Sequence, residues 1–490
     1  MLRTLLCLSC FGLFNVTAAA GEKPARETSA SQTATEDRFE IRNVEGWTVY
    51  TNRALFAEHP EETAQTLEHL RWELYQIKLA APAQAVAHMQ ANTPIWMEWN
   101  EEVHLSYHPG RQWLLDRGYQ VPADPQSMMS LSVKTHYPDS YRHPFAIFHE
   151  MAHAYDFYFT GQGQRYGNDE IQAAYDRMME TDKYENVLLW NGKYKSHYAR
   201  SNRMEYWAES TEAYFAVNDF YPFVRAELRQ FDPEQVRIIE RYWGIDPRKV
   251  QQLEDELAAY LEQAEIAETC SPSIGYTPTN QYSKRDIDGW TVYVHPELAQ
   301  EPGLCDTMVT LVAYKLHMID HFISEQGQAE LHRIPIWLEN GSAGPYIQYC
   351  GNRAQMRRQG LNPDKFQAVE IRDPQRMLRW ALLQQSDLLH CLALGYYDRH
   401  VAGEGSERQT ELQAAFEQAQ QSDEYGSVLR FDGRQVPHPG LRDEKAYFAK
   451  LMESYFLVND HYPFIRGELK EQDPDGYEIV AGLWEGCPPR

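Results

Sequence analysis

Two histidines four residues apart, with a glutamate beside the first, are the residues of this chain best suited to metal chemistry. The segment reads His149, Glu150, Met151, Ala152 and His153. On a helix, residues four apart project from one face, so both imidazoles can bind a single ion. Zinc in hydrolytic sites takes three protein ligands and a water, and Glu150 stands where it can accept a proton from that water. The motif therefore indicates a zinc site with Glu150 as general base.

An altered copy of this segment follows 241 residues later. His390, Cys391 and Leu394 stand at the matching places, so one histidine is kept while the glutamate and the second histidine are lost. Longer segments recur at the same offset, such as residues 214–223 and 455–464. We expect residues that the second copy keeps to serve the fold, and residues lost together with the motif to serve the chemistry.

The third zinc ligand must come from elsewhere, and the repeat distinguishes between Glu205, Glu209 and Glu212 of one predicted helix. At the matching places the second copy has alanine, lysine and glutamate. We therefore expect Glu205 to bind the metal and Glu212 to serve the fold. Glu209, one turn beyond Glu205, is expected to orient a ligand histidine from the second coordination shell. Glu209 and Asp156 are the alternatives for the third ligand.

A donor for the charge that develops on a carbonyl oxygen would complete a hydrolytic site. His197 and Tyr198 lie shortly before the helix that carries Glu205. The second copy keeps the histidine, as His438, and has Pro439 in place of the tyrosine. Tyr198 is therefore the predicted donor, and His197 is assigned to the fold or the surface.

This set of residues is similar to the catalytic domain of the anthrax-lethal-factor-like gluzincins. The resemblance rests on the HExxH motif, on Tyr198 seven residues before Glu205, and on the E-aromatic-aromatic-A-E sequence of residues 205–209. It is strong over about residues 143–225. The chain also resembles secreted bacterial metallopeptidases with E-Y-F/W-A-E and N-D-x-Y-P-F segments. The resemblance implies zinc binding by the two histidines and Glu205, acid and base catalysis by Glu150, and oxyanion stabilisation by Tyr198.

The expected fold class is α+β and helix-dominated, as a tandem duplication of a zincin-like metallopeptidase domain. Short strands are predicted near residues 47–50, 94–98 and 128–133, and the motif helix over about 144–160. The strand at 128–133 is more simply an ordinary sheet strand than an edge that binds a peptide. The predicted segments are a signal peptide (1–20), a disordered polar tether (21–38), the active domain (39–262), a linker (263–285) and the degenerate inactive copy (286–490).

The net charge limits the classes of binding partner, and the N-terminal sequence indicates the cellular compartment. A formal net charge of −25 argues against nucleic acid or an anionic membrane as the main partner. Residues 1–20 combine Arg3, an apolar run and an A-x-A site, which predicts export to the periplasm or the medium of a bacterium, without stable membrane insertion. The mature chain keeps an odd number of cysteines, so at least one thiol should be free. They are Cys270, Cys305, Cys350, Cys391 and Cys487.

These observations predict an exported zinc-dependent peptidase that acts on a peptide or protein substrate, binds one Zn2+ per chain and carries a C-terminal pseudo-enzyme repeat. Two alternatives stay open. One is a non-catalytic recognition or scaffold protein with structural zinc, which would need a fourth protein ligand that the sequence does not single out. The other is a zinc hydrolase of a non-peptide amide.

Overall fold

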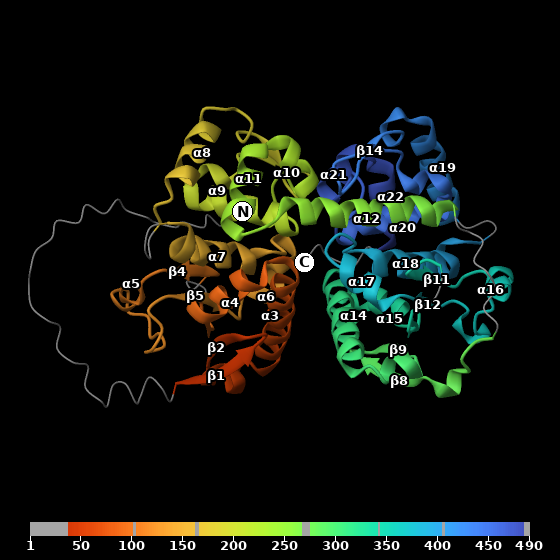
Figure 1. Cartoon of the computed structure of the whole chain (residues 1–490), viewed down its shortest axis with the longest axis horizontal. Helices are drawn as coiled ribbons and strands as arrows, with labels where there is room; N and C mark the ends of the chain where they lie inside the picture. Colours follow the sequence, from red (N-terminus) through yellow and green to blue (C-terminus); the bar gives the residue numbers. More distant parts are fainter. Residues whose placement is uncertain are drawn as a thin grey trace, which may run out of the picture.

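Two lobes lie side by side, and a long helix crosses both of them (Figure 1). The computed structural model describes residues 38–100, 104–161, 166–266, 275–341, 344–403 and 407–484. Small sheets combine with many helices, which confirms a helix-rich α+β fold. The predicted signal peptide and all but the last residue of the predicted tether lie outside the described residues. Within the described part of the chain, no helix is both long and apolar enough to cross a bilayer.

The sheet of the first lobe has five short strands in the order β1-β2-β3-β5-β4. They are β1 (Phe39–Val44), β2 (Trp47–Asn52), β3 (Ile95–Glu98), β4 (Ser106–His108) and β5 (Met128–Ser132). The three central strands are parallel, and the outer two run antiparallel to their neighbours. Strands β3 and β5 are buried along their whole length, as parallel strands covered on both faces are. The predicted strand at 128–133 is therefore an interior strand, and β4 is the edge.

Helices cover this sheet and build the upper part of the lobe. They are α2 (Arg53–Glu58), α3 (Pro60–Ala80), α4 (Ala83–Asn92), α5 (Arg111–Leu115), α6 (His136–Asp139), α7 (Ala146–Tyr155), α8 (Asp169–Met179), α9 (Arg203–Phe215), α10 (Arg225–Phe231), α11 (Pro233–Trp243) and the crossing helix α12 (Pro247–Ile266). Short elements are η1 (Ser140–Arg142), the π turn η2 (Asp156–Thr160), η3 (Tyr198–Arg200), and the pair β6 (Val187–Leu188) and β7 (Tyr194–Lys195). The predicted motif helix is thus α7 continued by η2.

The second lobe repeats the strand order of the first, read here as β8-β9-β10-β12-β11. Its strands are β8 (Ser283–Ile287), β9 (Trp290–Val294), β10 (Ile336–Leu338), β11 (Ile347–Tyr349), β12 (Val369–Ile371), β13 (Val428–Leu429) and β14 (Gln435–Val436). Its helices are α13 (Pro296–Ala299), α14 (Pro302–Phe322), α15 (Glu325–Leu331), α16 (Arg353–Gln359), α17 (Pro374–Trp380), α18 (Asp387–Tyr396), α19 (Glu407–Gln421), α20 (Glu444–Phe456), α21 (Arg466–Gln472) and α22 (Pro474–Leu483). The 3-10 segments are η4 (Thr279–Gln281), η5 (Pro363–Lys365), η7 (Asp423–Tyr425) and η8 (Pro439–Arg442), and η6 (Tyr397–Val401) is a π turn.

Aromatic packing fixes α7 against α9 and α11. The rings of Tyr155 and Trp243 stack with centroids 4.1 Å apart, and Trp207 stacks on Trp243 at 5.9 Å. The indole N–H of Trp207 also donates to the carbonyl of Ala152 at 3.1 Å. Every residue of α7 except Glu150 is buried. Since full burial of one large apolar side chain stabilises by about 1.5–3 kcal/mol, this core gives the motif helix a fixed position and rotation.

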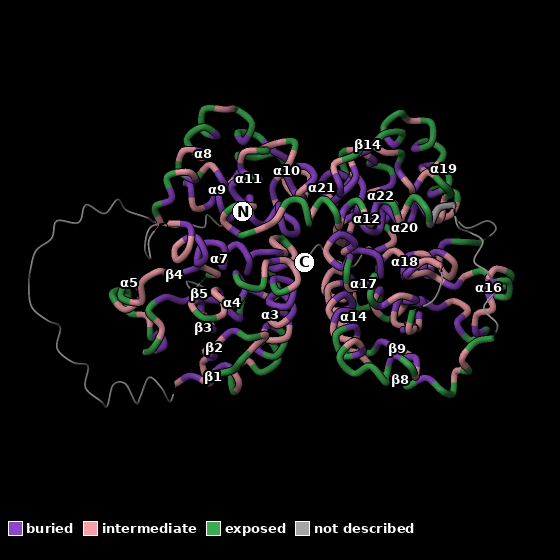
Figure 2. Tube along the Cα trace, viewed as in Figure 1, coloured by how far each residue is buried: buried purple, intermediate pink, exposed green. Residues whose placement is uncertain are grey.

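The two lobes share apolar core at their contact. Trp72 and Tyr75 of α3, and Leu257 and Ala258 of α12, belong to the core of the second lobe. The hydroxyl of Tyr260 on α12 accepts the backbone N–H of Tyr346 at 2.7 Å. Buried chain runs through the inside of both lobes and along their contact, whereas the outermost loops and helix faces are exposed (Figure 2). The lobes are therefore packed against each other rather than merely linked.

Candidate metal centre

Helices α7 and α9 bring together the three side chains predicted to bind zinc. Glu205 Oε2 lies 3.0 Å from His149 Nε2 and 3.2 Å from His153 Nε2, and all three residues are buried. Asn202 caps α9 by accepting the backbone N–H groups of Met204 and Glu205, which holds Glu205 in the first turn. Two imidazoles and one carboxylate that converge in this way fit a zinc ion, whose ligand atoms lie about 2.0–2.2 Å from the metal.

A second carboxylate, that of Glu212, bonds to the ring nitrogen of His149 that points away from Glu205. The Nδ1 of His149 lies 2.6 Å from Glu212 Oε1, and the other oxygen of Glu212 bonds to His143 Nε2 at 2.7 Å. Glu209 was expected in this place, but its Oε1 is 3.9 Å from the same nitrogen, too far for a hydrogen bond. The expectation for Glu209 is therefore wrong. Seven residues are nearly two full helical turns, so Glu212 shares the face of Glu205 more closely than Glu209 does.

The charges of these side chains shift one another's pKa values. Burial alone would raise the pKa of Glu205, yet His153 and His149 hold it well below its usual range. Burial alone would lower the pKa of His149, but hydrogen bonds with Glu205 and Glu212 hold it well above its usual range. Without metal, the two carboxylates therefore favour a proton on the His149 imidazole. A cation at this site must displace a proton, so its binding grows weaker at low pH.

Glu150 lies beside the ligands and is held by the edge strand of the sheet. The backbone N–H of Tyr107 in β4 donates to Glu150 Oε2 at 2.6 Å. Burial raises the pKa of Glu150, while His153 and His149 act in the opposite direction. A carboxylate oriented by one hydrogen bond and of raised basicity is suited to accept a proton at the site.

Tyr198 and its neighbour His197 have different surroundings in the structure. The half-buried Tyr198 has its ring centroid 6.4 Å from that of His149. His197 is buried, and its Nδ1 accepts the backbone N–H of Ala199 at 3.1 Å, capping η3. His438 makes the same bond to Gly440 in the second lobe. His197 therefore serves the local fold, whereas Tyr198 lies next to the ligand set.

The other two predicted alternatives have different surroundings. Asp156 is fully buried and forms an ion pair with Arg203 at 3.0 Å, which ties η2 to the start of α9. It belongs to no group of potential metal ligands among the described residues. Glu209 is also buried, and its Oε2 has no hydrogen-bond partner. Burial, with Asp219 and Glu212 nearby, raises the pKa of Glu209 well above its usual range.

Sequence reasoning missed three contributors to the site. Tyr107 acts through its backbone, which no residue type signals. Burial raises the pKa of Tyr166 well above its usual range, with Glu150 and Glu205 among the charges that act on its hydroxyl. His143, which bonds to Glu212, is matched by a glutamine 241 residues later, in the second lobe. The rule applied to Glu205, loss together with the motif, would have found His143.

The second lobe has a hydrogen bond that matches the one between His149 and Glu212, but it lacks the counterparts of His153 and Glu205. His390 Nδ1 lies 2.6 Å from Glu453 Oε1, the same pair as His149 and Glu212. At the place of Glu209, the buried Lys450 donates to Asp460 at 2.6 Å and to Glu453 at 3.1 Å. Burial raises the pKa of Cys391 well above its usual range, so it is a thiol and no nucleophile. Of the residues that the structure describes, none in this lobe forms a three-ligand group.

Three of the five cysteines that follow the predicted signal peptide are described, and all three are buried and unpaired. They are Cys305, Cys350 and Cys391. The expectation of at least one free thiol is confirmed, while Cys270 and Cys487 lie outside the described residues.

No protein-family model, curated protein or solved structure matches this chain. The interpretation of the site therefore depends on the geometry of its own side chains.

Replacing the buried lysine of the second lobe should destabilise the protein. Lys450→Met leaves Asp460 and Glu453 buried without their cation, so we expect a loss of about 3–5 kcal/mol in the free energy of unfolding. Denaturant titration at pH 7 measures this loss. The control is Lys445→Met, because its ion pair with Asp398 is partly exposed and should contribute less than about 1 kcal/mol. Equal, small losses in both variants would contradict the prediction.

The same ion pairs predict the pH dependence of this stabilisation. Burial alone would raise the pKa of Asp460, but Lys450 and His461 hold it well below its usual range. A carboxyl group whose pKa is lower in the folded state stabilises the folded protein at pH values above its unfolded pKa of about 4. The difference between wild type and Lys450→Met should therefore shrink as the pH falls below 4. A difference that grows on acidification would contradict this assignment.

Proposed function

We propose that the first lobe is a zinc-dependent peptidase domain of an exported protein, and that the second lobe is a pseudo-enzyme copy of it. One observation carries the proposal: His149 Nε2, His153 Nε2 and Glu205 Oε2 converge in a buried site with Glu150 at its side. The shared strand order and the shared histidine–glutamate pair support the duplication. The zincin-like relationship of the first lobe is part of the same proposal.

Each residue of the site has a distinct task in hydrolysis. When bound, zinc supplies a Lewis acid that activates water and polarises a substrate carbonyl. Glu150 accepts the proton of the attacking water and passes it to the leaving amine, and the Tyr107 N–H keeps its carboxylate turned toward the site. Glu212 fixes the ring of His149 so that Nε2 faces the ion. Tyr198 donates a hydrogen bond to the developing oxyanion.

The position of Glu150 favours a peptide as substrate. Strand β4 ends the sheet, and the outward N–H of its central residue, Tyr107, reaches Glu150. The side of β4 that has no neighbouring strand among the described residues therefore lies beside Glu150. An extended peptide that adds to this edge would bring its own backbone carbonyls to the ligand set. This arrangement supports peptide hydrolysis over cleavage of a compact, non-peptide amide.

The number of protein ligands supports a catalytic metal ion rather than a purely structural one. A structural zinc site is closed by four protein ligands, whereas a catalytic one keeps a place for water. Among the described residues, His149, His153 and Glu205 form a group of three. The fourth place is left to water and substrate.

Removing the general base should abolish cleavage and leave the metal in place. Glu150→Gln keeps the size and one hydrogen-bond acceptor but cannot take the proton, so we expect peptide hydrolysis to fall by about 10²–10⁴-fold. The measurement is digestion of a proteome-derived peptide library, read by mass spectrometry, together with the zinc content. Chelation should stop wild-type cleavage, and added Zn2+ should restore it.

The control for this variant is Glu58→Gln, which alters an exposed glutamate of α2. It should cleave like wild type. Full activity of Glu150→Gln, or wild-type cleavage that survives chelation, would overturn the proposed mechanism.

Two glutamates of α9 should differ in their effect on zinc. Glu205→Gln removes a ligand charge, so the protein should lose this zinc on desalting. Glu212→Gln leaves the three ligands in place and removes the charge that contacts His149 and His143, so the zinc affinity should weaken by about 10–100-fold. Competition with a chromophoric chelator measures both.

Glu453→Gln is the matched control, because it removes the charge of the same histidine–glutamate pair in the second lobe. Its zinc affinity should equal that of wild type. If Glu453→Gln releases the zinc, or Glu205→Gln retains it at full affinity, the ligand set is assigned to the wrong residues.

A further inference from the structure

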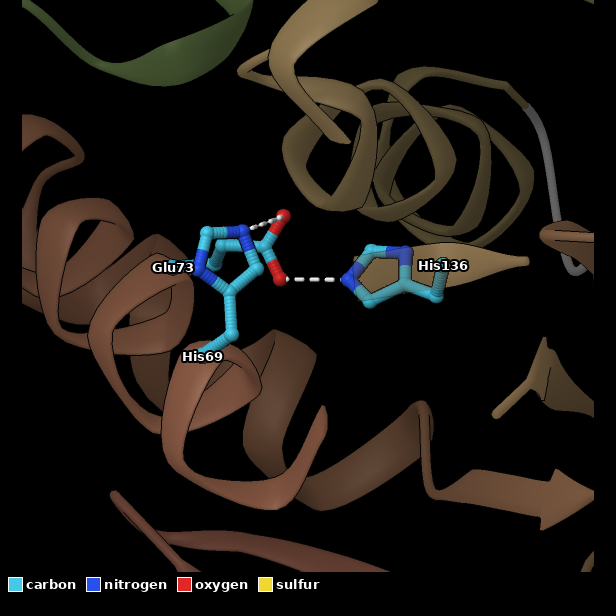
Figure 3. Close-up of side chains that lie close together, drawn as sticks. All are labelled: His69, Glu73 and His136. Atoms are coloured by element: carbon cyan, nitrogen blue, oxygen red, sulfur yellow. Dashed lines mark hydrogen bonds and ion pairs between the residues drawn. The ribbon is translucent and has the colours of Figure 1, made fainter. Parts of the chain in front are cut away.

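A second group of metal-ligating side chains lies where the two lobes meet. His69 and Glu73 are on α3, and His136 begins α6. Glu73 Oε2 lies 2.6 Å from His136 Nε2, and Glu73 Oε1 lies 3.8 Å from His69 Nε2. Figure 3 shows the carboxylate of Glu73 between the two imidazole rings. None of these residues takes part in the centre formed by α7 and α9.

The burial of this group leaves one oxygen without a partner. His69, Glu73 and His136 are 2%, 2% and 7% exposed. The Oε1 of Glu73 is buried and has no hydrogen-bond partner, since 3.8 Å to His69 Nε2 is too long. An unpaired carboxylate oxygen away from water is costly, and such costs are normally offset by a hydrogen bond or a cation. A cation between the three side chains would satisfy it.

The donor set and its spacing are those of a transition-metal site. His69 and Glu73 are four residues apart on one helix, so they project from the same face. His136 approaches from a separate element, and the three ligand atoms lie within 4.8 Å of one another. Two imidazoles with one carboxylate suit zinc better than calcium or magnesium, which prefer oxygen ligands.

A histidine of the second lobe, His317, contacts the ring nitrogen of His69 that does not face Glu73. His69 Nδ1 lies 3.0 Å from Nε2 of His317 on α14. With Nε2 of His69 directed at Glu73 and His136, its Nδ1–H can donate to His317, as the outer nitrogen of a ligating histidine usually does to a neighbour. Nearby, Ser140 Oγ bonds to His321 Nε2 of the same helix at 2.8 Å. The group therefore joins both lobes through α3 and α14.

We propose that His69, Glu73 and His136 bind a second divalent transition-metal ion, most simply Zn2+, which stabilises the contact between the two lobes. The expected content then becomes two zinc ions per chain rather than the one predicted from the HExxH motif. This site stands independently of the peptidase proposal, because the two centres share no residue. His317 is a positioning residue that acts through His69.

Zinc content of the full chain tests the proposal directly. The protein is loaded with Zn2+, desalted and analysed for metal by mass spectrometry. Wild type should hold two equivalents, His136→Ala one, His153→Ala one, and the double variant none. A wild type with one equivalent that is lost in His153→Ala and kept in His136→Ala would overturn the second site and leave the first intact. The reverse pattern would remove the first site and leave the second.

A conservative variant separates metal binding from a simple hydrogen-bond network. Glu73→Gln keeps the shape and can still bond to His136, so a network without metal would leave the zinc content unchanged and refute the site. A metal site should lose one equivalent. His332→Ala, a histidine in none of the three-ligand groups, is the control and should leave the content at two.

Thermal unfolding gives a readout that does not depend on activity. Zn2+ added to metal-free His153→Ala should raise its Tm, and this rise should disappear when Glu73→Gln is combined with it. His317→Ala in the same background should weaken the apparent zinc affinity by about 10–100-fold, as loss of an outer partner does. A metal-free His153→Ala whose Tm does not respond to Zn2+ would refute the proposal.

Discussion

A buried hydrogen bond between His149 Nδ1 and Glu212 Oε1 is the contact on which the candidate centre depends. It joins the two helices that carry all three ligands, and it leaves Nε2 as the nitrogen that faces Glu205. Both groups are inside the protein, where an unpaired imidazole or carboxylate would be costly, so neither can turn away without loss of stability. The aromatic stack of Tyr155, Trp243 and Trp207 then sets the separation of the same helices.

The second lobe contains the matching hydrogen bond, between His390 and Glu453, without the predicted metal ligands around it. His390 and Glu453 repeat it at the same length, between helices that match α7 and α9. Around it, alanine stands in place of Glu205, and Lys450 stands in place of Glu209. The lysine donates to Glu453, whose counterpart in the first lobe, Glu212, bonds to His143 and His149. The pair therefore belongs to the fold of both lobes, and the surrounding charges distinguish the candidate metal site of the first lobe from the closed ion-pair network of the second.

Much of this arrangement could be predicted from the sequence, because similar segments that recur 241 residues apart allow a comparison within one chain. The α+β class, the motif helix and the convergence of His149, His153 and Glu205 all agree with the structure. The role given to Glu209 was wrong, since spacing alone does not fix which face of α9 meets α7. Tyr107 was missed because it acts through its backbone, and the group of His69, Glu73 and His136 because His136 lies far from α3 in the sequence.

We propose that a zinc ion binds between α7 and α9 to three protein ligands and no more. Anomalous diffraction at the zinc absorption edge, from crystals of the zinc-loaded full chain, locates such an ion. We expect a peak within about 2.0–2.2 Å of His149 Nε2, His153 Nε2 and a Glu205 oxygen, with a solvent molecule as the remaining ligand. No peak at this place, or a peak closed by a fourth protein side chain, would contradict it.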